Sequence, residues 1–520
     1  GENLLADLVN IVVRFRLPVF PFIADVEKAF LMVGVEEKDR DFLKIAWKDG
    51  DGALHFDRFA RVPFGISCGP HLLLKTLHHH LDAQPPSPVV DIIRRSLYMD
   101  DLVTGADSLA DVLILKEEAT RILSEAGMHL RKFVSVPRLQ ALWSAEPPAP
   151  CKVLGVAWSP LEDMISVSLK LDAAFTRREV LSSVAKVFDP LGLVAPWLIG
   201  AKLLLQELCR SSPEWDAPLD SSLQAEYDAM VEDSSDRRLA LPRRVCFSAE
   251  SELFIFCDAS PQAYAAVAYL RTGGAVQFLL ARARVAPLKP AMTVPRLELM
   301  GAVLAARLSR FLSAALGAPT IRRRFFTDST VALGWIRKPP ATNVFVRNRV
   351  RGILDSTSAG DWSHVPGDEN PADLATRGLS AHELLEQDQW LCPRYVALHP
   401  PLPSGHTVSA ARQPALLFPV QLERFSSLRR AVLATAYVLR FCYNARRNAA
   451  ERIRGALSAS ELDVARLRLL ASAQAEQPEF EAVKSGDELP PRSPLWNARP
   501  VLDEASGVVV CQPRCGGSPL

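Results

Sequence analysis

Short runs of apolar residues that end in an acid recur along this chain. Three such runs are followed by Asp25, Asp258 and Asp328. A short apolar run bounded in this way is the pattern of a buried strand. The sequence therefore predicts three strands, each with a carboxylate at the point where the chain leaves the sheet.

A helical period lies between the last two of these strands. Leu297, Met300, Leu304 and Leu308 recur at helical spacing and leave Glu298 beside the apolar stripe. The sequence predicts a helix that opens near residue 295 and carries Glu298 in its first turns. An ordinary surface position is the alternative for this glutamate.

A second helix start is predicted at residues 370–373. An asparagine stands at the cap, a proline at the first helical position and Asp373 in the first turn. The helix dipole alone accounts for an acid at such a place. The order strand, helix, strand, helix is nevertheless hard to explain as chance for four acids of this kind. These acids are Asp258, Glu298, Asp328 and Asp373.

Two adjacent carboxylates follow an aromatic residue near position 100. Asp100 and Asp101 come directly after Tyr98-Met99 in an apolar, β-prone context. Neighbouring like charges disfavour ionisation unless a cation is bound. Asp25, at the end of an apolar strand, is placed to complete an oxygen-only site of the kind that suits Mg²⁺. A solvated turn is the alternative for a bare Asp-Asp pair.

Composition bounds these hypotheses. A length of 520 residues predicts several domains, and 48% hydrophobic residues suffice for packed cores. No apolar run reaches the roughly 18 residues of a membrane span, and no secretory signal is visible. Nine cysteines without paired spacing favour reduced thiols in a cytosolic or nuclear setting.

Charge gives a mixed signal about nucleic acid. A net charge of +1 is low for a protein that binds a chain of phosphates. Bases nevertheless gather in short runs, which predict contacts to a nucleic-acid backbone or, alternatively, exposed helix faces. These runs are 322–324, 337–338 and 347–351.

The hairpin acids and their flanks resemble the palm of retroelement reverse transcriptases. The resemblance implies that Asp25 and Asp100 hold catalytic metals, that Asp101 assists, and that Phe30 crowds a ribose 2′-OH and so favours dNTPs. Phe64 stands where many relatives carry Gln. The other substrate-binding positions that the resemblance implies are Phe64 and Gly65 beside the incoming nucleotide, Tyr98 and Met99 of the hairpin, and Arg131 and Lys132, which grip the primer.

The later acids resemble the Asp, Glu, Asp, Asp quartet of the RNase H fold, which binds two metal ions and hydrolyses RNA in an RNA–DNA hybrid. The resemblance maps the quartet onto Asp258, Glu298, Asp328 and Asp373. Many relatives carry a histidine on a loop before the last acid. His364 is the nearest candidate, but its position before Pro366-Gly367 is more typical of a strand, and Asp368 occupies the loop.

Longer strings resemble the Pao/BEL class of LTR retrotransposons. They occur at 176–181, 188–192, 294–299 and 370–378. The fold class implied is a multidomain α/β and α+β chain with a right-hand polymerase palm, a thumb and connection, an RNase H-like α/β domain and a helical tail. The predicted domains are the palm with partial fingers (1–135), thumb and connection (136–246), RNase H (247–380), a proline-rich linker (381–423) and a helical segment that precedes integrase (424–520).

The function expected from this resemblance is RNA-directed DNA polymerase and ribonuclease H of a retrotransposon polyprotein. Mg²⁺ or Mn²⁺ is the implied cofactor, with two ions in each active site. The implied partners are RNA template, DNA primer, RNA–DNA hybrid, dNTPs and other polyprotein segments such as integrase, without a membrane. The implied location is cytoplasmic, in a virus-like particle, or nuclear. The alternatives are a decayed or domesticated nucleic-acid-binding protein and a scaffold for an integrase or capsid partner.

Some expected features are not found in the sequence. The chain opens just before Asp25, so the fingers strands whose Lys and Arg hold the triphosphate are expected to be missing, and polymerase activity of this piece is in doubt. No Asp-Ser-Gly or Asp-Thr-Gly protease motif occurs. The histidines at 78–80 lack carboxylates or cysteines at ligand spacing and predict a solvated helix face, and Cys511 and Cys515 have no downstream metal-binding pair.

Overall fold

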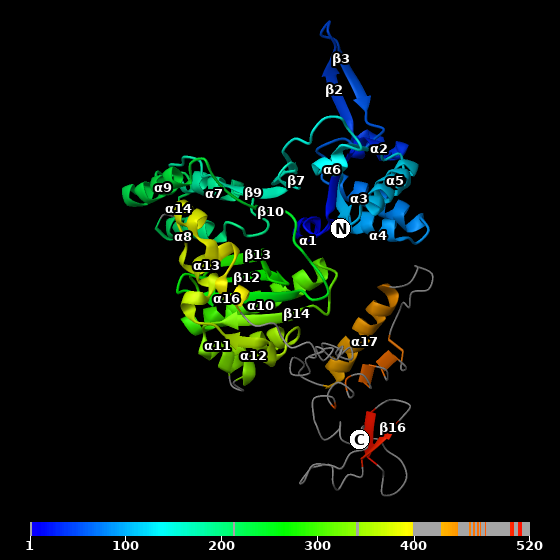
Figure 1. Ribbon diagram of the computed structural model, residues 1–520. Coiled ribbons are helices and arrows are strands. Elements are labelled where there is room, and N and C mark those ends of the chain that lie inside the picture. Colours follow the sequence, from blue (N-terminus) through cyan, green and yellow to red (C-terminus); the bar gives the residue numbers. More distant parts are fainter. Residues whose placement is uncertain are drawn as a thin grey trace. The chain divides into compact units, whose positions relative to one another are not determined.

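The structure is a computed structural model, in which the chain forms two compact units, Gly1–Pro403 and Ser404–Leu520 (Figure 1). It describes residues 3–211, 214–339, 343–398, 428–445, 500–503 and 508–511, with scattered positions between 457 and 474. Among these residues, no helix combines the length and the apolar character that crossing a membrane requires.

The first sheet is antiparallel and has the strand order β4-β5-β1-β6. Helices flank it, and the apolar faces of α3, α4 and α5 form one core with it, whereas the buried residues of α1 belong to the core of the second and third sheets. Capping residues mark the start of two of these helices. The Ser87 side chain caps α4 directly before Pro88, and the Ser108 side chain caps α5. The elements are β1 (Phe20–Val26), β4 (Leu97–Tyr98), β5 (Asp101–Ala106), β6 (Leu130–Ser135), α1 (Leu8–Phe15), α2 (Ala29–Met32), α3 (Gly69–Ala83), α4 (Pro88–Ser96), α5 (Leu109–Glu125) and α6 (Pro137–Gln140).

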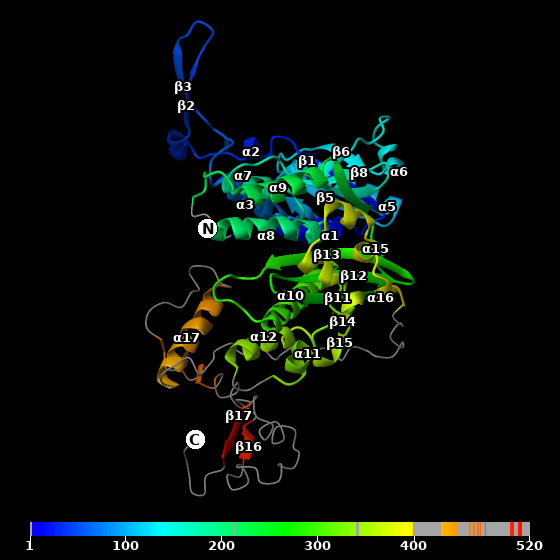
Figure 2. The ribbon, with the colours of Figure 1, turned by 90° about the vertical axis from the view of Figure 1, so that its left-hand side faces the viewer.

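A two-stranded hairpin projects from this first sheet (Figure 2). It consists of β2 (Lys44–Lys48) and β3 (Leu54–Arg58), preceded by η1 (Glu37–Phe42), and every residue of both strands is exposed. On one face, Trp47 stacks on His55 with 4.8 Å between ring centroids and donates a hydrogen bond to Asp57. On the other face, Phe56 is 71% exposed.

The second sheet follows in the order β10-β9-β8-β7. Its helix α7 begins with a capping box in which Thr176 and Glu179 satisfy each other's backbone. The elements of this segment are β7 (Cys151–Val153), β8 (Val156–Ser159), β9 (Met164–Leu169), β10 (Arg237–Pro242), α7 (Arg177–Lys186), α8 (Ala195–Ser211) and α9 (Ser221–Ser234).

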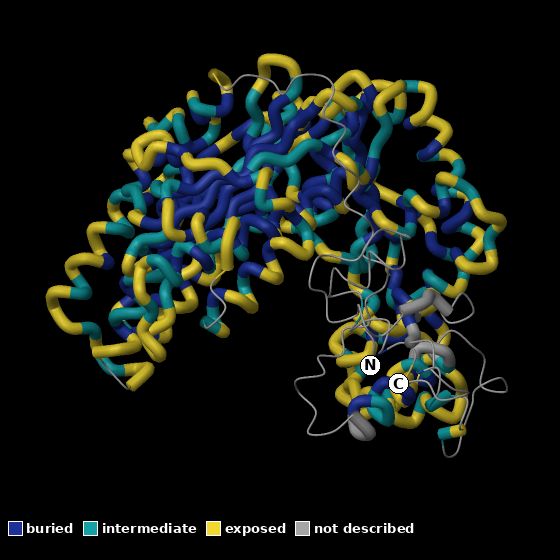
Figure 3. Tube along the Cα trace, turned by 90° about the horizontal axis from the view of Figure 1, so that it is seen from below, coloured by how far each residue is buried: buried dark blue, intermediate teal, exposed yellow. Residues whose placement is uncertain are grey.

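The third sheet is mixed, with the order β13-β12-β11-β14-β15. Strands β11, β14 and β15 run parallel, whereas β12 and β13 are antiparallel to their neighbours. Its central strands are buried on both faces, so they lack the alternation of a half-exposed strand (Figure 3). The elements are β11 (Glu252–Ala259), β12 (Ala263–Thr272), β13 (Ala275–Val285), β14 (Arg322–Thr327), β15 (Trp362–His364), α10 (Val294–Ala315), α11 (Thr330–Arg337) and α12 (Val344–Leu354).

Strand β14 pairs with β11 from Arg322 to Phe326 on one side, whereas its other side is paired only in part. Arg322, Arg323 and Arg324 pair with β11, but β15 joins the other side only from Phe325 onward. The first half of β14 therefore forms an edge of the sheet among the described residues, and it consists of three consecutive arginines.

Several predicted elements are confirmed. Strands β1 and β11 end one residue after Asp25 and Asp258, β14 ends just before Asp328, and α10 carries Glu298. Asn370 caps the predicted helix start by accepting the Ala372 N–H. That start is divided into a 3-10 turn η4 (Pro371–Asp373) and the short helix α13 (Leu374–Arg377).

Part of the predicted linker has regular structure. Residues 381–398 form α14 (Ala381–Glu386), α15 (Asp388–Leu391) and α16 (Arg394–Leu398). Trp390 is fully buried, and its indole donates to the Leu193 carbonyl at 2.7 Å. Proline content misled the linker assignment here, because these short helices gain their stability from tertiary packing, which local composition does not report. The later prolines of the predicted linker lie outside the described residues.

The second unit contains α17 (Leu428–Ala445), which agrees with the predicted helical stretch, and a hairpin of β16 (Pro500–Asp503) and β17 (Val508–Cys511). Arg440 in α17 forms an ion pair with Glu461 at 2.6 Å. The hairpin was not expected from the sequence. Cys515 lies outside the described residues.

Candidate functional sites

The first candidate site lies where β1 and β5 pair. Asp25 stands directly opposite Asp101 in the antiparallel register, so their side chains share one face of the sheet. Asp100 belongs to the turn between β4 and β5, and its carbonyl accepts the Val26 N–H at 2.8 Å. Met99 in the same turn has φ +56°, which allows the tight reversal. The structure thus brings Asp25, Asp100 and Asp101 together.

The electrostatics of this site favour a cation. The pKa of Asp101 is raised from 3.8 to about 6, first because the carboxyl is partly buried and then because Asp100 and Asp25 repel its charge. Lys132 lies on the same side, with Nζ 3.4 Å from Asp25 Oδ2. A register shift between β1 and β6 and a positive φ of 52° bring Lys132 to this position.

The predicted substrate-binding residues lie on several elements of the first sheet and its surroundings. Phe30 and Phe64 meet edge to face with 5.6 Å between ring centroids, and Phe64 is 72% exposed. Gly65 follows with φ +89°, a conformation that a side chain would strain. Tyr98 pairs with Asp101 across the hairpin. Arg131 pairs with Glu27 at 3.1 Å instead of contacting the acids.

The second candidate site lies at the carboxyl ends of β11 and β14. These strands are parallel neighbours in register at Phe256 and Phe326, so Asp258 and Asp328 leave the sheet side by side. Glu298 from α10 joins them, held by a 2.5 Å hydrogen bond donated by the Ser329 hydroxyl.

The fourth acid, Asp373, is the last residue of η4. The Thr376 hydroxyl donates to Asp258 Oδ2, which ties α13 to β11. Arg377 Nε donates to Asp373 Oδ1 at 2.6 Å, while the arginine side chain remains 75% exposed. The amide of Asn370 donates to the Cys257 carbonyl at 3.1 Å and fixes the start of the segment. All four predicted acids therefore lie around the end of β11.

Burial and mutual repulsion shape the charge of this second site. The pKa of Asp258 is raised from 3.8 to about 7, mainly by burial and then by the charges of Asp328 and Asp373. Burial and Asp328 also raise the pKa of Glu298. A bound cation would relieve this repulsion, because an opposite charge favours the ionised carboxylates.

A divalent metal fits the donor set of either site in chemistry. Carboxylate oxygens are ligands of Mg²⁺ and Mn²⁺. Within the described residues, however, no group of three or more His, Cys, Asp or Glu side chains is arranged so as to hold a metal ion. Within each of the two sets, the acids are close enough for their charges to repel one another. The metal assignments therefore stay predictions.

Some residues of the sites were not found from the sequence. Thr376, Arg377 and Ser329 are the polar partners of the four acids. The only sequence signal for Thr376 and Arg377 is their place one turn after Asp373. His364 is confirmed as a strand residue, in β15, and Asp368 lies in the 3-10 turn η3 (Gly367–Glu369).

A mixed sheet with carboxylates at the ends of two neighbouring parallel strands, joined by acids from two helical elements, is the arrangement that the RNase H resemblance implies. Residues 176–329 match the family model described as Pao retrotransposon-like RNaseH-like domain. The chain is therefore similar to a retrotransposon RNase H-like segment over these residues. The match begins within the predicted thumb and connection (136–246) and ends within the predicted RNase H range (247–380). No curated protein matches the chain.

Three solved structures of a foamy viral protease-reverse transcriptase resemble the chain, each over 70% of its length. A form described as dRH, in complex with double-stranded DNA, is 16% identical with a TM-score of 0.48. A complex with RNA/DNA hybrid is 15% identical with a TM-score of 0.44, and a further complex with double-stranded DNA is 16% identical with 0.42. The chain covers 59%, 46% and 70% of these proteins, in the same order.

Proposed function

We propose that the third sheet and its helices form a ribonuclease H that hydrolyses the RNA strand of an RNA–DNA hybrid. The convergence of Asp258, Glu298, Asp328 and the Asp373 segment at the end of β11 carries this proposal. The family match over residues 176–329 supports it.

In such a site the four acids would bind metal ions, and the neighbouring hydroxyls would orient the acids. Asp258 and Asp328, at the strand ends, would hold two divalent ions, and Glu298 and Asp373 would complete the two coordination shells. The bound ions would activate water and stabilise the leaving oxygen. Thr376 and Ser329 orient carboxylates by donating hydrogen bonds, so that the acids are held before substrate arrives. The 2′-OH and A-like shape of the RNA strand would supply selection.

Asp328→Asn is expected to abolish this cleavage. The change removes one anionic ligand but keeps side-chain volume, so hybrid binding should stay within about threefold of the unaltered chain. The measurement is Mg²⁺-dependent cleavage of a labelled hybrid by the full chain. Asp355→Asn, at an exposed position at the end of α12, is the matched control and should cleave normally. Full activity in Asp328→Asn would refute the assignment.

We further propose that the first sheet is the palm of an RNA-directed DNA polymerase. The direct opposition of Asp25 and Asp101, with Asp100 in the adjoining turn, supports this second function. Asp25 and Asp100 would hold the metals, and Phe30 would exclude a ribose 2′-OH. RNA template, DNA primer and dNTPs would be the substrates. A cytoplasmic, particle-associated role beside other polyprotein segments is part of the same proposal.

Asp100→Asn is expected to abolish dNTP incorporation on an RNA template with a DNA primer while leaving hybrid cleavage intact. The two activities use different carboxylates, so each variant serves as the other's control. A chain that binds the primed template but incorporates nothing, with or without the change, would favour a nucleic-acid-binding role for this sheet over catalysis.

A further inference from the structure

The turn that leads into α8 is built around one half-buried carboxylate, that of Asp189. Asp189 accepts the backbone N–H groups of Leu193 and Val194, each at 2.8 Å. Burial raises the pKa of Asp189, while these hydrogen bonds oppose the rise. Gly192 has φ +70°, and a Cβ there would lie 2.1 Å from the Ala281 carbonyl oxygen. Only glycine fits this approach of the turn to β13.

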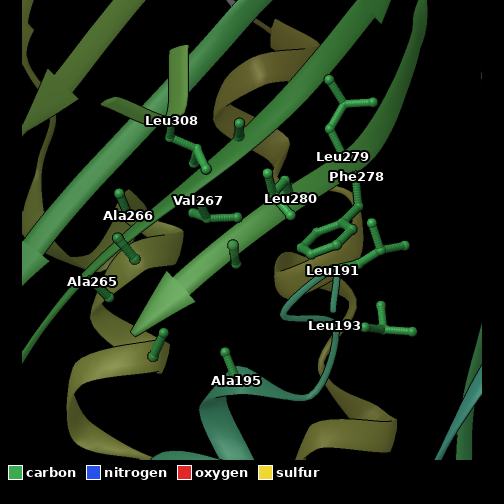
Figure 4. Packing of buried hydrophobic residues seen from close by; sticks show 14 of the residues in the cluster. Leu191, Leu193, Ala195, Ala265, Ala266, Val267, Phe278, Leu279, Leu280 and Leu308 are labelled. Atoms are coloured by element: carbon green, nitrogen blue, oxygen red, sulfur yellow. The ribbon is translucent and has the colours of Figure 1, made fainter. Parts of the chain in front are cut away.

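This turn is bonded to the edge of the third sheet. The Ala281 N–H donates to the Leu191 carbonyl at 2.8 Å, and Arg282 donates to the Pro190 carbonyl at 2.9 Å. Leu191 and Leu193 also pack with the buried side chains of β13 (Figure 4). The segment thus lies against β13 through both backbone and side chains.

The first turn of α8 then contacts the end of α13. The Leu379 N–H donates to the Pro196 carbonyl at 2.9 Å. Gly378 has φ +91°, and a Cβ there would lie 3.5 Å from Ile199 Cγ2 and 3.6 Å from the Pro196 oxygen. The chain leaving α13 therefore passes directly over α8.

Helix α13 has only four residues, and a helix this short is not stable by itself. Its orientation must come from packing. Because Thr376 bonds Asp258 and Arg377 bonds Asp373, any tilt of α13 would move the fourth acid away from the strand ends.

We propose that residues 188–200, here named the α8 clamp, are the positioning element of the nuclease site. The clamp is anchored on β13 at one end and holds Gly378 and Leu379 at the other. It thereby fixes the orientation of α13 and the placing of Asp373 relative to Asp258. This inference rests on the proposed nuclease function and assigns that site a part of the chain that precedes β11.

The test uses the full chain carrying Gly378→Ala. The new methyl group meets α8, and the backbone at φ +91° is strained for any residue with a side chain. Gly317→Ala is the matched control, because Gly317 also has a positive φ of +65° at a helix end, with no atom within 4 Å of an added Cβ. Hydrogen exchange of the peptide spanning 370–379 is measured without metal and during titration with Mn²⁺ alone.

In Gly378→Ala, exchange of this peptide should rise about tenfold, and the Mn²⁺ concentration that half-protects it should rise about tenfold, the size of effect seen when the support of a metal ligand is lost. Gly317→Ala should change neither. Equal behaviour of the two variants would overturn the inference. The readouts need no substrate, so a chain that fails to cleave hybrid would refute the nuclease function without affecting this result.

Should Gly378→Ala fail to fold, Ile199→Leu tests the same contact. Leucine keeps the side-chain volume but has no methyl group on Cβ, so the variant loses Cγ2, the atom that lies 3.5 Å from the place of a Cβ at position 378. We expect the same two changes at about threefold. An unaltered exchange rate and Mn²⁺ response in this folded variant would overturn the inference.

Discussion

Asp258→Asn is expected to remove hybrid cleavage and, at the same time, to stabilise the metal-free protein at neutral and alkaline pH. Loss of a metal ligand forfeits several kcal/mol of transition-state stabilisation, so we expect a fall of at least about 10³-fold in cleavage rate. The gain in stability has a separate cause. Asp258 is 5% exposed and lies among other acids, so its ionised form is penalised in the folded state.

The sign of the pH dependence follows from the raised pKa. The folded pKa of about 7 exceeds the ordinary 3.8, so the native state holds a proton that the unfolded chain has lost between these values. The unaltered protein therefore loses stability as pH rises toward 7, by on the order of a few kcal/mol in total. Asparagine cannot ionise and escapes this loss.

Thermal unfolding without metal, between pH 5 and pH 8, measures the effect. The advantage of Asp258→Asn over the unaltered chain should grow with pH and level off above about pH 7. Asp355→Asn should show no such growth. A gain that is the same at both ends of the range would mean that repulsion among the acids does not set the stability of this site.

A fragment limited to residues 247–380 is expected not to fold, whereas residues 176–398 are expected to unfold cooperatively. The short fragment lacks the α8 clamp and helices α14–α16, of which α15 and α16 pack against β13. In this fragment Phe278 loses its packing contacts with Trp390 and Leu191. The Tyr269 hydroxyl loses the hydrogen bond that it donates to the Trp390 carbonyl. Each large apolar side chain that loses its burial costs roughly 1.5–3 kcal/mol, so a few suffice to cancel the ~5–15 kcal/mol that holds a domain.

Circular dichroism and thermal unfolding of the two fragments decide this point. A single sharp transition in residues 247–380 would show that the sheet and α10 suffice, and would contradict the structural role given to the clamp. An intermediate fragment, residues 176–380, separates the contribution of α8 from that of α14–α16, since it retains the turn at Asp189 but lacks Trp390.

The positions of the acidic residues were easier to predict from the sequence than the residues that hold these acids in place. Strand exits at Asp258 and Asp328 are readable because continuous apolar runs mark strands buried on both faces. The contact of Thr376 with Asp258 was not readable, since it depends on the way α13 packs against β11 and joins residues more than 110 positions apart. Trp390 was missed for a related reason: its partner Leu193 is 197 residues away, and only a proline-rich context lay nearby.

The same limit applies to the first site. The pattern at Tyr98–Asp101 predicted the hairpin, and Asp25 was placed on a strand end. The exact opposition of Asp25 and Asp101, however, follows from the antiparallel register of β1 and β5, which sequence pattern alone does not fix. Lys132 reaches Asp25 only through a register shift in the pairing with β6.

The three arginines at the start of β14 have a consequence for solubility. An unpaired strand edge offers its N–H and C=O groups to any extended peptide, and charged side chains discourage such an addition. Arg322 is drawn toward the buried Glu252, 3.8 Å away, whereas Arg323 and Arg324 add further charge to the open edge. The three arginines therefore disfavour the addition of a strand from another chain at this edge. Because the net charge of the chain is only +1, this effect depends on the local concentration of charge at the unpaired part of β14.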